Sequence, residues 1–192
     1  SYNELSQYPI IPWVKFPSGQ TRNLKYTIEA QDETRREYLL IKYDGLEDAK
    51  YKQHYSILYS NPSFVQLYLV RLSPFTEEQI KLQSGKFEEG NRQFASLNEI
   101  FKALGVNHET RELIPHFFTS VEFCYNYNCN FFGFRRKDSL IVHNLDLPGN
   151  SDPFIYISDQ LSILNSVETK QKLNFFIDNV FGIGQYGGKE NF

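Results

Sequence analysis

The sequence contains no methionine, one tryptophan (Trp13) and only two cysteines, Cys124 and Cys129. Because there is no second cysteine pair, a zinc site with four cysteine ligands is excluded. We expect both cysteines to be reduced and buried, with a disulfide or a metal site as the alternative. A chain without methionine does not include its own start residue, so we expect a processed product or a segment of a longer protein.

The sequence also has no strong excess of charge and no long apolar run. Its formal charge is -3, which provides no general positive field for nucleic acid, so we expect no nucleic-acid partner. No run approaches the roughly 20 apolar residues that span a bilayer, so we expect a soluble or peripheral protein. The length of 192 residues favours one domain over residues 1–192.

Few residues have the spacing of a catalytic or cofactor site, and we predict no catalytic, cofactor-binding or metal-binding residues. The histidines show no metal-ligand spacing, so each is interpreted as a surface or capping residue; they are His54, His108, His116 and His143. Gly182, Gly184 and Gly187 match G-x-G-x-x-G. Dinucleotide binding requires a strand before this motif and a helix after it. Here a predicted helix precedes it, which indicates a glycine-rich helix stop.

The densest basic cluster is the triplet Arg135-Arg136-Lys137, followed by Asp138. No hydrophobic face of the kind seen in an interfacial helix flanks it in sequence. We interpret it as a solvated loop, with a phospholipid contact as the alternative. The acidic pair Glu88 and Glu89 is interpreted as a solvated turn.

Aromatic residues make up 16% of the chain, which predicts an aromatic core. Pro9 and Pro12 predict an extended segment over residues 1–20. Apolar spacing and end signals predict helices over residues 32–45, 63–72, 91–105 and 165–181. Residues 115–153 lack a sustained period and are expected to be irregular, with one short strand within 139–147.

Two of these helices carry specific expectations. Asn165 and Glu168 are expected to form a variant capping box. The apolar stripe of the last helix comprises Leu173, Phe176, Ile177, Val180 and Phe181. The helix over 91–105 is expected to present Phe94, Leu97, Phe101 and Leu104 on one face, before Gly105.

Five blocks along the chain carry a family resemblance: SYNELSQYPIIPWV, YLVRLSPFT, LQSGKFEEGNRQFAS, ELIPHFF and FIDNVFGIGQYGG. Their order and spacing resemble the BEACH domain. The resemblance implies a mainly α fold whose helices surround a core containing extended, irregular segments. It also implies that this copy is incomplete at its N-terminus. The structural residues of the matched motifs are Asn3, Pro9, Pro12, Trp13, Arg71, Pro74, Phe75, Gly85, Phe87, Pro115, Asp178 and Gly182.

Within such a fold, the opening segment is expected to be buried without regular structure. Buried backbone must find hydrogen-bond partners, and we expect the side chains of Asn3, Gln7 and Tyr8 to supply them. Trp13 is interpreted as a core anchor.

The chain departs from the family pattern at polar positions. Leu58 replaces a histidine, Thr27 and Glu29 replace a proline and a glycine, Phe176 replaces a tryptophan, and Tyr186 replaces an arginine. These changes lead to the hypothesis that the fold is retained under different functional pressure.

The resemblance implies a non-enzymatic scaffold that acts in membrane trafficking or vesicle and organelle dynamics, without a cofactor. Expected partners are other proteins or neighbouring subunits, with peripheral membrane association and an intracellular location, cytoplasmic or on an internal membrane. Pleckstrin-like and WD40 domains usually flank the domain in this family but are absent from this chain. The alternative is an accessory subunit of a large stable complex. A remote alternative is an enzyme of unrecognised chemistry.

Overall fold

The computed structural model describes residues 2–3, 9–16, 18–47, 52, 54, 56–57, 62–87, 89–103, 111–186 and 188–189. Over these residues the protein is mainly helical, as predicted. The seven α-helices of this part are α1 (Glu33–Asp44), α2 (Pro62–Tyr68), α3 (Phe75–Leu82), α4 (Leu97–Ala103), α5 (His116–Thr119), α6 (Pro153–Leu164) and α7 (Val167–Val180). Two-residue strands, β1 (Tyr2–Asn3) and β2 (Ser56–Ile57), pair in parallel.

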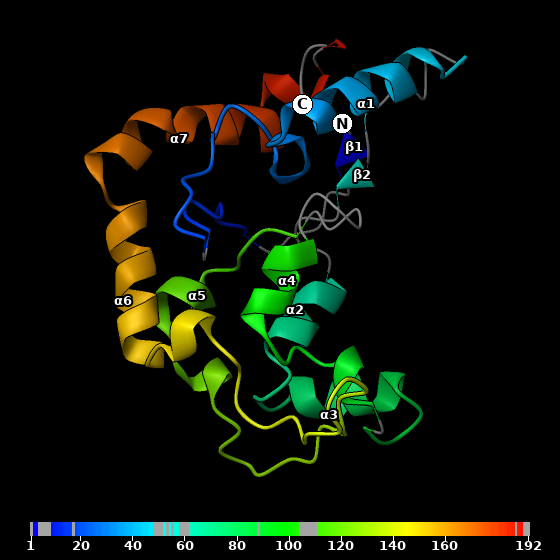
Figure 1. Ribbon diagram of the computed structural model, residues 1–192, viewed down its shortest axis with the longest axis vertical. Coiled ribbons are helices and arrows are strands. Elements are labelled where there is room, and N and C mark those ends of the chain that lie inside the picture. Colours follow the sequence, from blue (N-terminus) through cyan, green and yellow to red (C-terminus); the bar gives the residue numbers. More distant parts are fainter. Residues whose placement is uncertain are drawn as a thin grey trace.

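The helices follow a curved path (Figure 1). Helices α1 and α7 lie at one end, α6 runs down one side against α5, and α2 and α4 occupy the middle. Helix α3 contacts α2 and lies toward the opposite end (Figure 1). Short 3-10 turns lie before, between and after these helices: η1 (Ile28–Ala30), η3 (Gly90–Arg92), η4 (Glu122–Cys124), η5 (Pro148–Asn150) and η6 (Ile183–Tyr186).

The N-terminal segment is extended over residues 9–16, which confirms that part of the prediction, whereas residues 18–19 lie in a tight turn with Gly19 at a φ of 85°. Ile11 and Leu113 exchange backbone hydrogen bonds of 2.9 and 3.1 Å, and the Arg22 N–H donates to the Val14 carbonyl at 2.9 Å. These partners lie far along the chain or across a turn, so Ile11 and Val14 pair their backbone groups outside the β1–β2 sheet.

Helix α1 has the predicted ends. The Asp32 side chain accepts from the Arg35 N–H at 3.0 Å, and Gly45 follows the last helical residue. Of the two adjacent apolar residues in the middle of α1, Leu39 is buried whereas Tyr38 is 50% exposed.

Helix α7 begins one residue later than predicted, because Ser166 rather than Asn165 is its N-cap and accepts from the Thr169 N–H at 3.2 Å. Asn165 instead ends α6. Phe176 and Val180 are buried. Ile177 and Phe181 are exposed, so the predicted apolar stripe is only partly used in packing.

Two predicted helices are shorter in the structure. Helix α2 ends at Tyr68, and the next residues form a buried turn. Helix α4 starts at Leu97, and Phe94 is buried outside it. The cause is a distant strand-like contact, because the Asp146 N–H donates to the Ala95 carbonyl and the Leu97 N–H to the Asp146 carbonyl, each at 2.9 Å. Leu104 and Gly105 lie outside the described residues.

Three helices were not predicted. Helix α6 begins at Asp152-Pro153, where the Asp152 carboxylate accepts from the Phe154 N–H at 2.9 Å and proline occupies the first turn. Helices α3 and α5 were also missed. Residues 139–147 contribute isolated backbone pairings, at Ile141 and Asp146, rather than the expected strand.

The core consists of two clusters of buried side chains. The larger surrounds Trp13 and Phe117 and extends to Phe132 and Tyr156. The smaller joins Ile10, Leu24, Ala30, Leu39, Phe176 and Val180 beneath α1 and α7.

Candidate interaction surfaces

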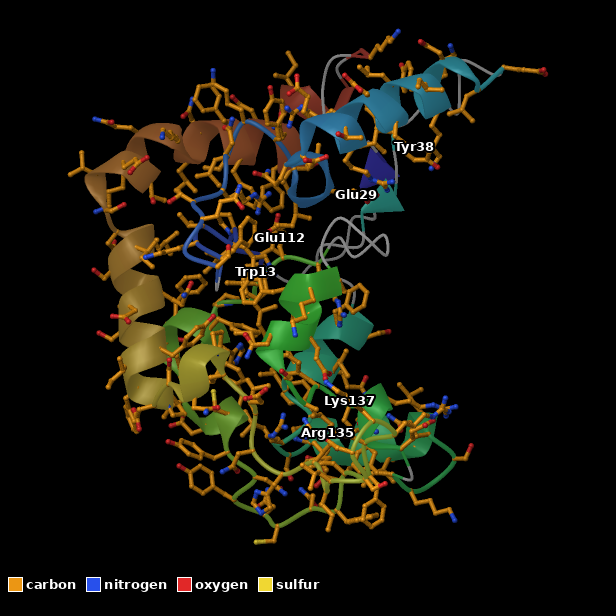
Figure 2. All side chains as sticks on the ribbon, in the orientation of Figure 1. Trp13, Glu29, Tyr38, Glu112, Arg135 and Lys137 are labelled. Atoms are coloured by element: carbon orange, nitrogen blue, oxygen red, sulfur yellow. The ribbon has the colours of Figure 1, made fainter. Side chains whose placement is uncertain are left out.

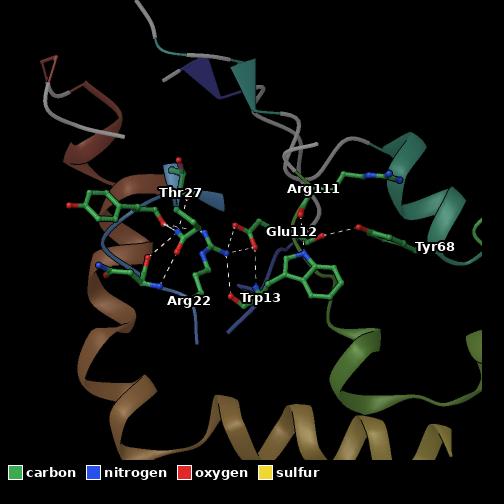
Figure 3. Close-up of polar contacts among 9 residues, drawn as sticks. Trp13, Arg22, Thr27, Tyr68, Arg111 and Glu112 are labelled. Atoms are coloured by element: carbon green, nitrogen blue, oxygen red, sulfur yellow. Dashed lines mark hydrogen bonds and ion pairs between the residues drawn. The ribbon is translucent and has the colours of Figure 1, made fainter. Parts of the chain in front are cut away.

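Trp13 lies between the two ends of the molecule and is 0% exposed (Figure 2). Its backbone N–H donates to the Glu112 carboxylate at 3.1 Å, and its indole Nε1–H donates to the Arg111 carbonyl at 2.9 Å (Figure 3). The Tyr68 hydroxyl donates to the Glu112 carbonyl at 3.3 Å. The residues around position 112 therefore hold the extended N-terminal segment from both backbone and side chain.

Glu112 also forms a buried ion pair with Arg22. The Arg22 Nη1 donates to Glu112 Oε2 at 2.8 Å, and neither side chain is exposed. Burial raises the pKa of Glu112 above its usual range, although Arg22 and the Trp13 N–H oppose this effect. The Arg22 guanidinium also lies 5.6 Å from the Phe176 ring centroid, so this pair connects the two core clusters.

The residues predicted to satisfy the opening segment are not described: residues 4–8 and the Asn3 side chain lie outside the described part. Glu112 satisfies the Trp13 N–H, and sequence reasoning did not single it out. The only local signal was a carboxylate directly before the apolar run LIPHFF.

The other described family-motif residues are spread along the chain, from Pro9 to Gly182 after α7. Arg71 is buried and donates to the carbonyls of His143 at 2.9 Å and Phe94 at 2.7 Å. Burial lowers its pKa to about 10. Pro12, Trp13, Arg71 and Phe87 are buried, Phe75, Pro115 and Gly182 are half-buried, and Pro9, Pro74, Gly85 and Asp178 are exposed.

The glycine motif follows helix α7, as the helix-stop interpretation predicted. A Cβ atom on Gly182 would lie 2.9 Å from Asp178 Cα, and one on Gly184 would lie 2.7 Å from Asn179 Oδ1. The two glycines therefore allow the chain to fold back tightly against the end of the helix. Gly187 lies outside the described residues.

The three described histidines lie in different parts of the fold. His54 is buried, which contradicts its assignment to the surface, and its Nε2 contacts the Lys189 carbonyl at 2.7 Å. His116 begins α5, where burial lowers its pKa, and His143 is exposed. His108 lies outside the described residues. In the part of the chain that the structure describes, no group of three or more metal-ligating side chains occurs.

The cysteines form no disulfide. Cys124 is buried, as predicted, whereas Cys129 is exposed, so the prediction for Cys129 was wrong.

The basic triplet lies on a hairpin, residues 131–142. Asp138 pairs with Arg135 at 2.6 Å, and the Leu140 N–H together with Arg135 lowers the pKa of Asp138. Glu89, which is half-buried, accepts from Arg136 Nη2 at 2.8 Å. Glu88 lies outside the described residues. The triplet is solvated as predicted, but exposed apolar side chains flank it, so the expectation of no flanking hydrophobic face was wrong.

Helix α6 exposes a second apolar surface. Phe154 and Ile155 are 63% and 61% exposed, and Leu161 is also exposed. We call Phe154, Ile155, Ser158, Leu161 and Ser162 the α6 outer face. These positions share one side of the helix, and none is charged.

Comparison with known proteins identifies the fold. The family model described as Beige/BEACH domain matches residues 1–191. The chain belongs to the BEACH domain family. It is 33% identical over 205 residues to "Beige protein homolog 1" of Schizosaccharomyces pombe, covering 97% of this chain and 8% of that protein. It is 33% identical over 201 residues to "BEACH domain-containing protein B" of Arabidopsis thaliana, again covering 97% of this chain and 8% of that protein. The chain thus spans less than a tenth of these relatives.

The departures from the BEACH pattern lie partly in the smaller core cluster and around it. Phe176 belongs to that cluster, and Thr27 is buried. The buried Glu29 forms an ion pair with Arg35 of α1. Leu58 and the side chain of Tyr186 lie outside the described residues. Among the described helices of this BEACH chain, none is both long enough and apolar enough to cross a bilayer.

Proposed function

We propose that this BEACH chain is a non-enzymatic scaffold that binds other proteins at intracellular membranes during vesicle or organelle traffic. Its membership of the BEACH family supports a role as a module within larger assemblies.

The α6 outer face is the observation that carries the protein-binding part of the proposal. Its large side chains are Phe154, Ile155 and Leu161, and the residues between them on this face are serines. The centre of a protein interface is rich in aromatic and aliphatic side chains and depleted of charge. On the opposite side of the same helix, Tyr156 and Ile157 are buried and position the exposed face.

Substitutions on α6 test this proposal. The tagged chain, expressed in its source cells, is purified in mild detergent, and the co-purifying proteins are quantified for the native chain and Phe154→Asp/Ile155→Asp. Aspartate in the first turn of a helix is compatible with the helix dipole, so we expect α6 to remain folded. The matched control is Ile41→Asp/Ile183→Asp, which changes two exposed apolar residues elsewhere.

We expect stoichiometric companions that are lost from the α6 variant and kept by the control. Companions that survive high salt and remain through size exclusion would favour an accessory subunit of a stable complex. Companions that dissociate there would favour the trafficking scaffold. Equal recovery with all three chains would refute the assignment to α6. Fractionation of the same cells tests the intracellular location. Absence of the chain from both the internal membranes and the cytoplasm would refute it.

A further inference from the structure

The hairpin of residues 131–142 exposes four large apolar side chains. Phe131, Phe134, Leu140 and Ile141 are each about half exposed, at 50%, 49%, 56% and 55%. Phe131 and Phe134 contact each other edge to face, with ring centroids 5.4 Å apart. These side chains gather on the outside of the hairpin, where water rather than protein faces them.

The core does not require these four residues, because their neighbours fill it. Phe132 and Val142 are buried, and the Phe132 ring lies 5.2 Å from that of Phe87. The hairpin therefore carries outward apolar residues beside its inward ones, although solvent-facing positions in a hairpin are ordinarily polar. Contiguous exposed apolar groups mark sites that contact another protein or a membrane.

Cations accompany the apolar side chains. Arg135, Arg136 and Lys137 form the turn, with Asp138 as the single carboxylate of the hairpin. Figure 2 shows Arg135 and Lys137 near the end of the molecule that carries α3, away from α1 and α7. Asp138 pairs with Arg135, and Glu89 of the neighbouring turn pairs with Arg136. Of the described residues, no carboxylate forms such a pair with Lys137, so this loop keeps a net positive charge although the chain as a whole has a formal charge of -3.

The hairpin is held in one conformation. The Arg135 N–H donates to the Leu140 carbonyl at 2.9 Å, and the Gly90 N–H donates to the Phe134 carbonyl at 2.8 Å. A Cβ atom on Gly90 would lie 2.6 Å from Val142 Cγ2, so η3 and the hairpin pack without space between them. The exposed groups are therefore presented by a fixed surface rather than by a loose loop.

The combination of residues favours a membrane over a protein partner. The centre of a protein interface is depleted of lysine, whereas here the exposed Lys137 stands among exposed apolar side chains. A peripheral membrane site combines cations that attract anionic headgroups with aromatic and aliphatic groups that enter the headgroup boundary.

We propose that residues 131–142 form a contact site for anionic phospholipid membranes. Arg136 and Lys137 bind headgroup phosphates or carboxylates, and Phe134 and Ile141 enter the interface. The proposal rests on the membrane-associated part of the proposed function and gives it a location. It does not depend on protein binding by α6.

Vesicle co-sedimentation with the purified chain tests the proposal. The probes are vesicles of phosphatidylcholine alone and of phosphatidylcholine with about one third phosphatidylserine. We expect binding to the anionic vesicles only, weakened by high salt because exposed charges are then screened. Each cation near the surface contributes about fivefold in affinity, so Arg136→Gln/Lys137→Gln is expected to weaken binding on the order of 25-fold.

Two control variants separate a specific site from general adhesion. Lys170→Gln/Lys172→Gln removes two exposed cations on α7, and Ile41→Ser/Ile183→Ser removes two exposed apolar residues. Both are expected to bind as the native chain does, whereas Phe134→Ser/Ile141→Ser is expected to lose binding. Circular dichroism and Trp13 fluorescence verify that each variant is folded.

The proposal is overturned if the native chain does not bind anionic vesicles, or if hairpin and control variants bind equally. A hairpin variant that keeps vesicle binding but loses a purified protein companion would assign the hairpin to a protein partner instead. Because the vesicle assay contains no other protein, its failure leaves the α6 experiment unaffected, and the two proposals fail separately.

Discussion

Replacement of Trp13 with alanine is expected to destabilise the chain by about 3–5 kcal/mol, the cost of emptying a large aromatic site in a core. Trp13 is fully buried, and the centroid of its ring lies 4.3 Å from the ring centroid of Phe101 and 6.1 Å from that of Phe117. Aromatic pairs of this kind contribute about 0.5–1.5 kcal/mol beyond burial. Since domains are stable by only about 5–15 kcal/mol, the variant is expected to lose a large part of its stability.

Trp13→Phe separates packing from hydrogen bonding. It keeps most of the ring but removes the Nε1–H, leaving the Arg111 carbonyl without its 2.9 Å donor. A buried polar group left unpaired costs about 1–3 kcal/mol, so this variant is expected to lie between the native chain and Trp13→Ala.

Urea unfolding followed by far-ultraviolet circular dichroism measures these differences, because both variants lack the only tryptophan. The control is Tyr38→Ala, which removes an aromatic side chain that is 50% exposed and is expected to change stability by less than about 1 kcal/mol. A Trp13→Ala chain with near-native melting would refute the anchor role. Equal loss from Trp13→Phe and Trp13→Ala would instead assign the whole effect to the indole hydrogen bond.

Three further predictions concern protonation, thiol chemistry and a helix end. Burial raises the pKa of Glu112 above 4.5, so its stabilising contribution is complete below about pH 4.5 and falls as the pH rises through the raised pKa. The difference in unfolding free energy between the native chain and Glu112→Gln should follow that slope, and the opposite slope would mean that the ion pair outweighs burial. A maleimide at neutral pH should label Cys129 rapidly but not Cys124, which is buried with its pKa raised to about 12; mass spectrometry should find both labelled only in urea, and two rapid sites in the folded chain would contradict the structure. Asp152→Ala should cost about 1 kcal/mol of stability through loss of the α6 cap, whereas Asp152→Asn should retain it; equal melting temperatures for the two variants would rule out capping.

Local chemistry explains what the sequence predicted well. The α1 boundaries depend on Asp32 and Gly45, which act within a few residues of themselves. The glycine turn after α7 is likewise local, since Gly182 packs against Asp178 one turn earlier. The overall fold class and the family followed from several long blocks, because blocks that keep their order constrain far more than a single short motif.

Distant contacts explain what the sequence did not predict. Phe94 has helical spacing, yet the chain there pairs with Asp146, about 50 residues away in sequence, and this contact delays the start of α4. The role of Glu112 depends on its proximity to Trp13 and Arg22, which no local pattern contains. The exposed apolar side chains beside Arg135 could not be predicted. The folded hairpin, rather than the local sequence, determines that Leu140 is exposed.

The attachment of Trp13 also has a consequence for synthesis of the chain. Its partners are 98 and 99 residues further along, and ribosomes add about 5–20 residues per second. The opening segment must therefore wait roughly 5–20 s before its hydrogen-bond acceptors have been made. During that interval Ile10, Ile11 and Val14 have no native core to enter, so nascent chains should depend on a ribosome-associated chaperone until residue 112 has emerged.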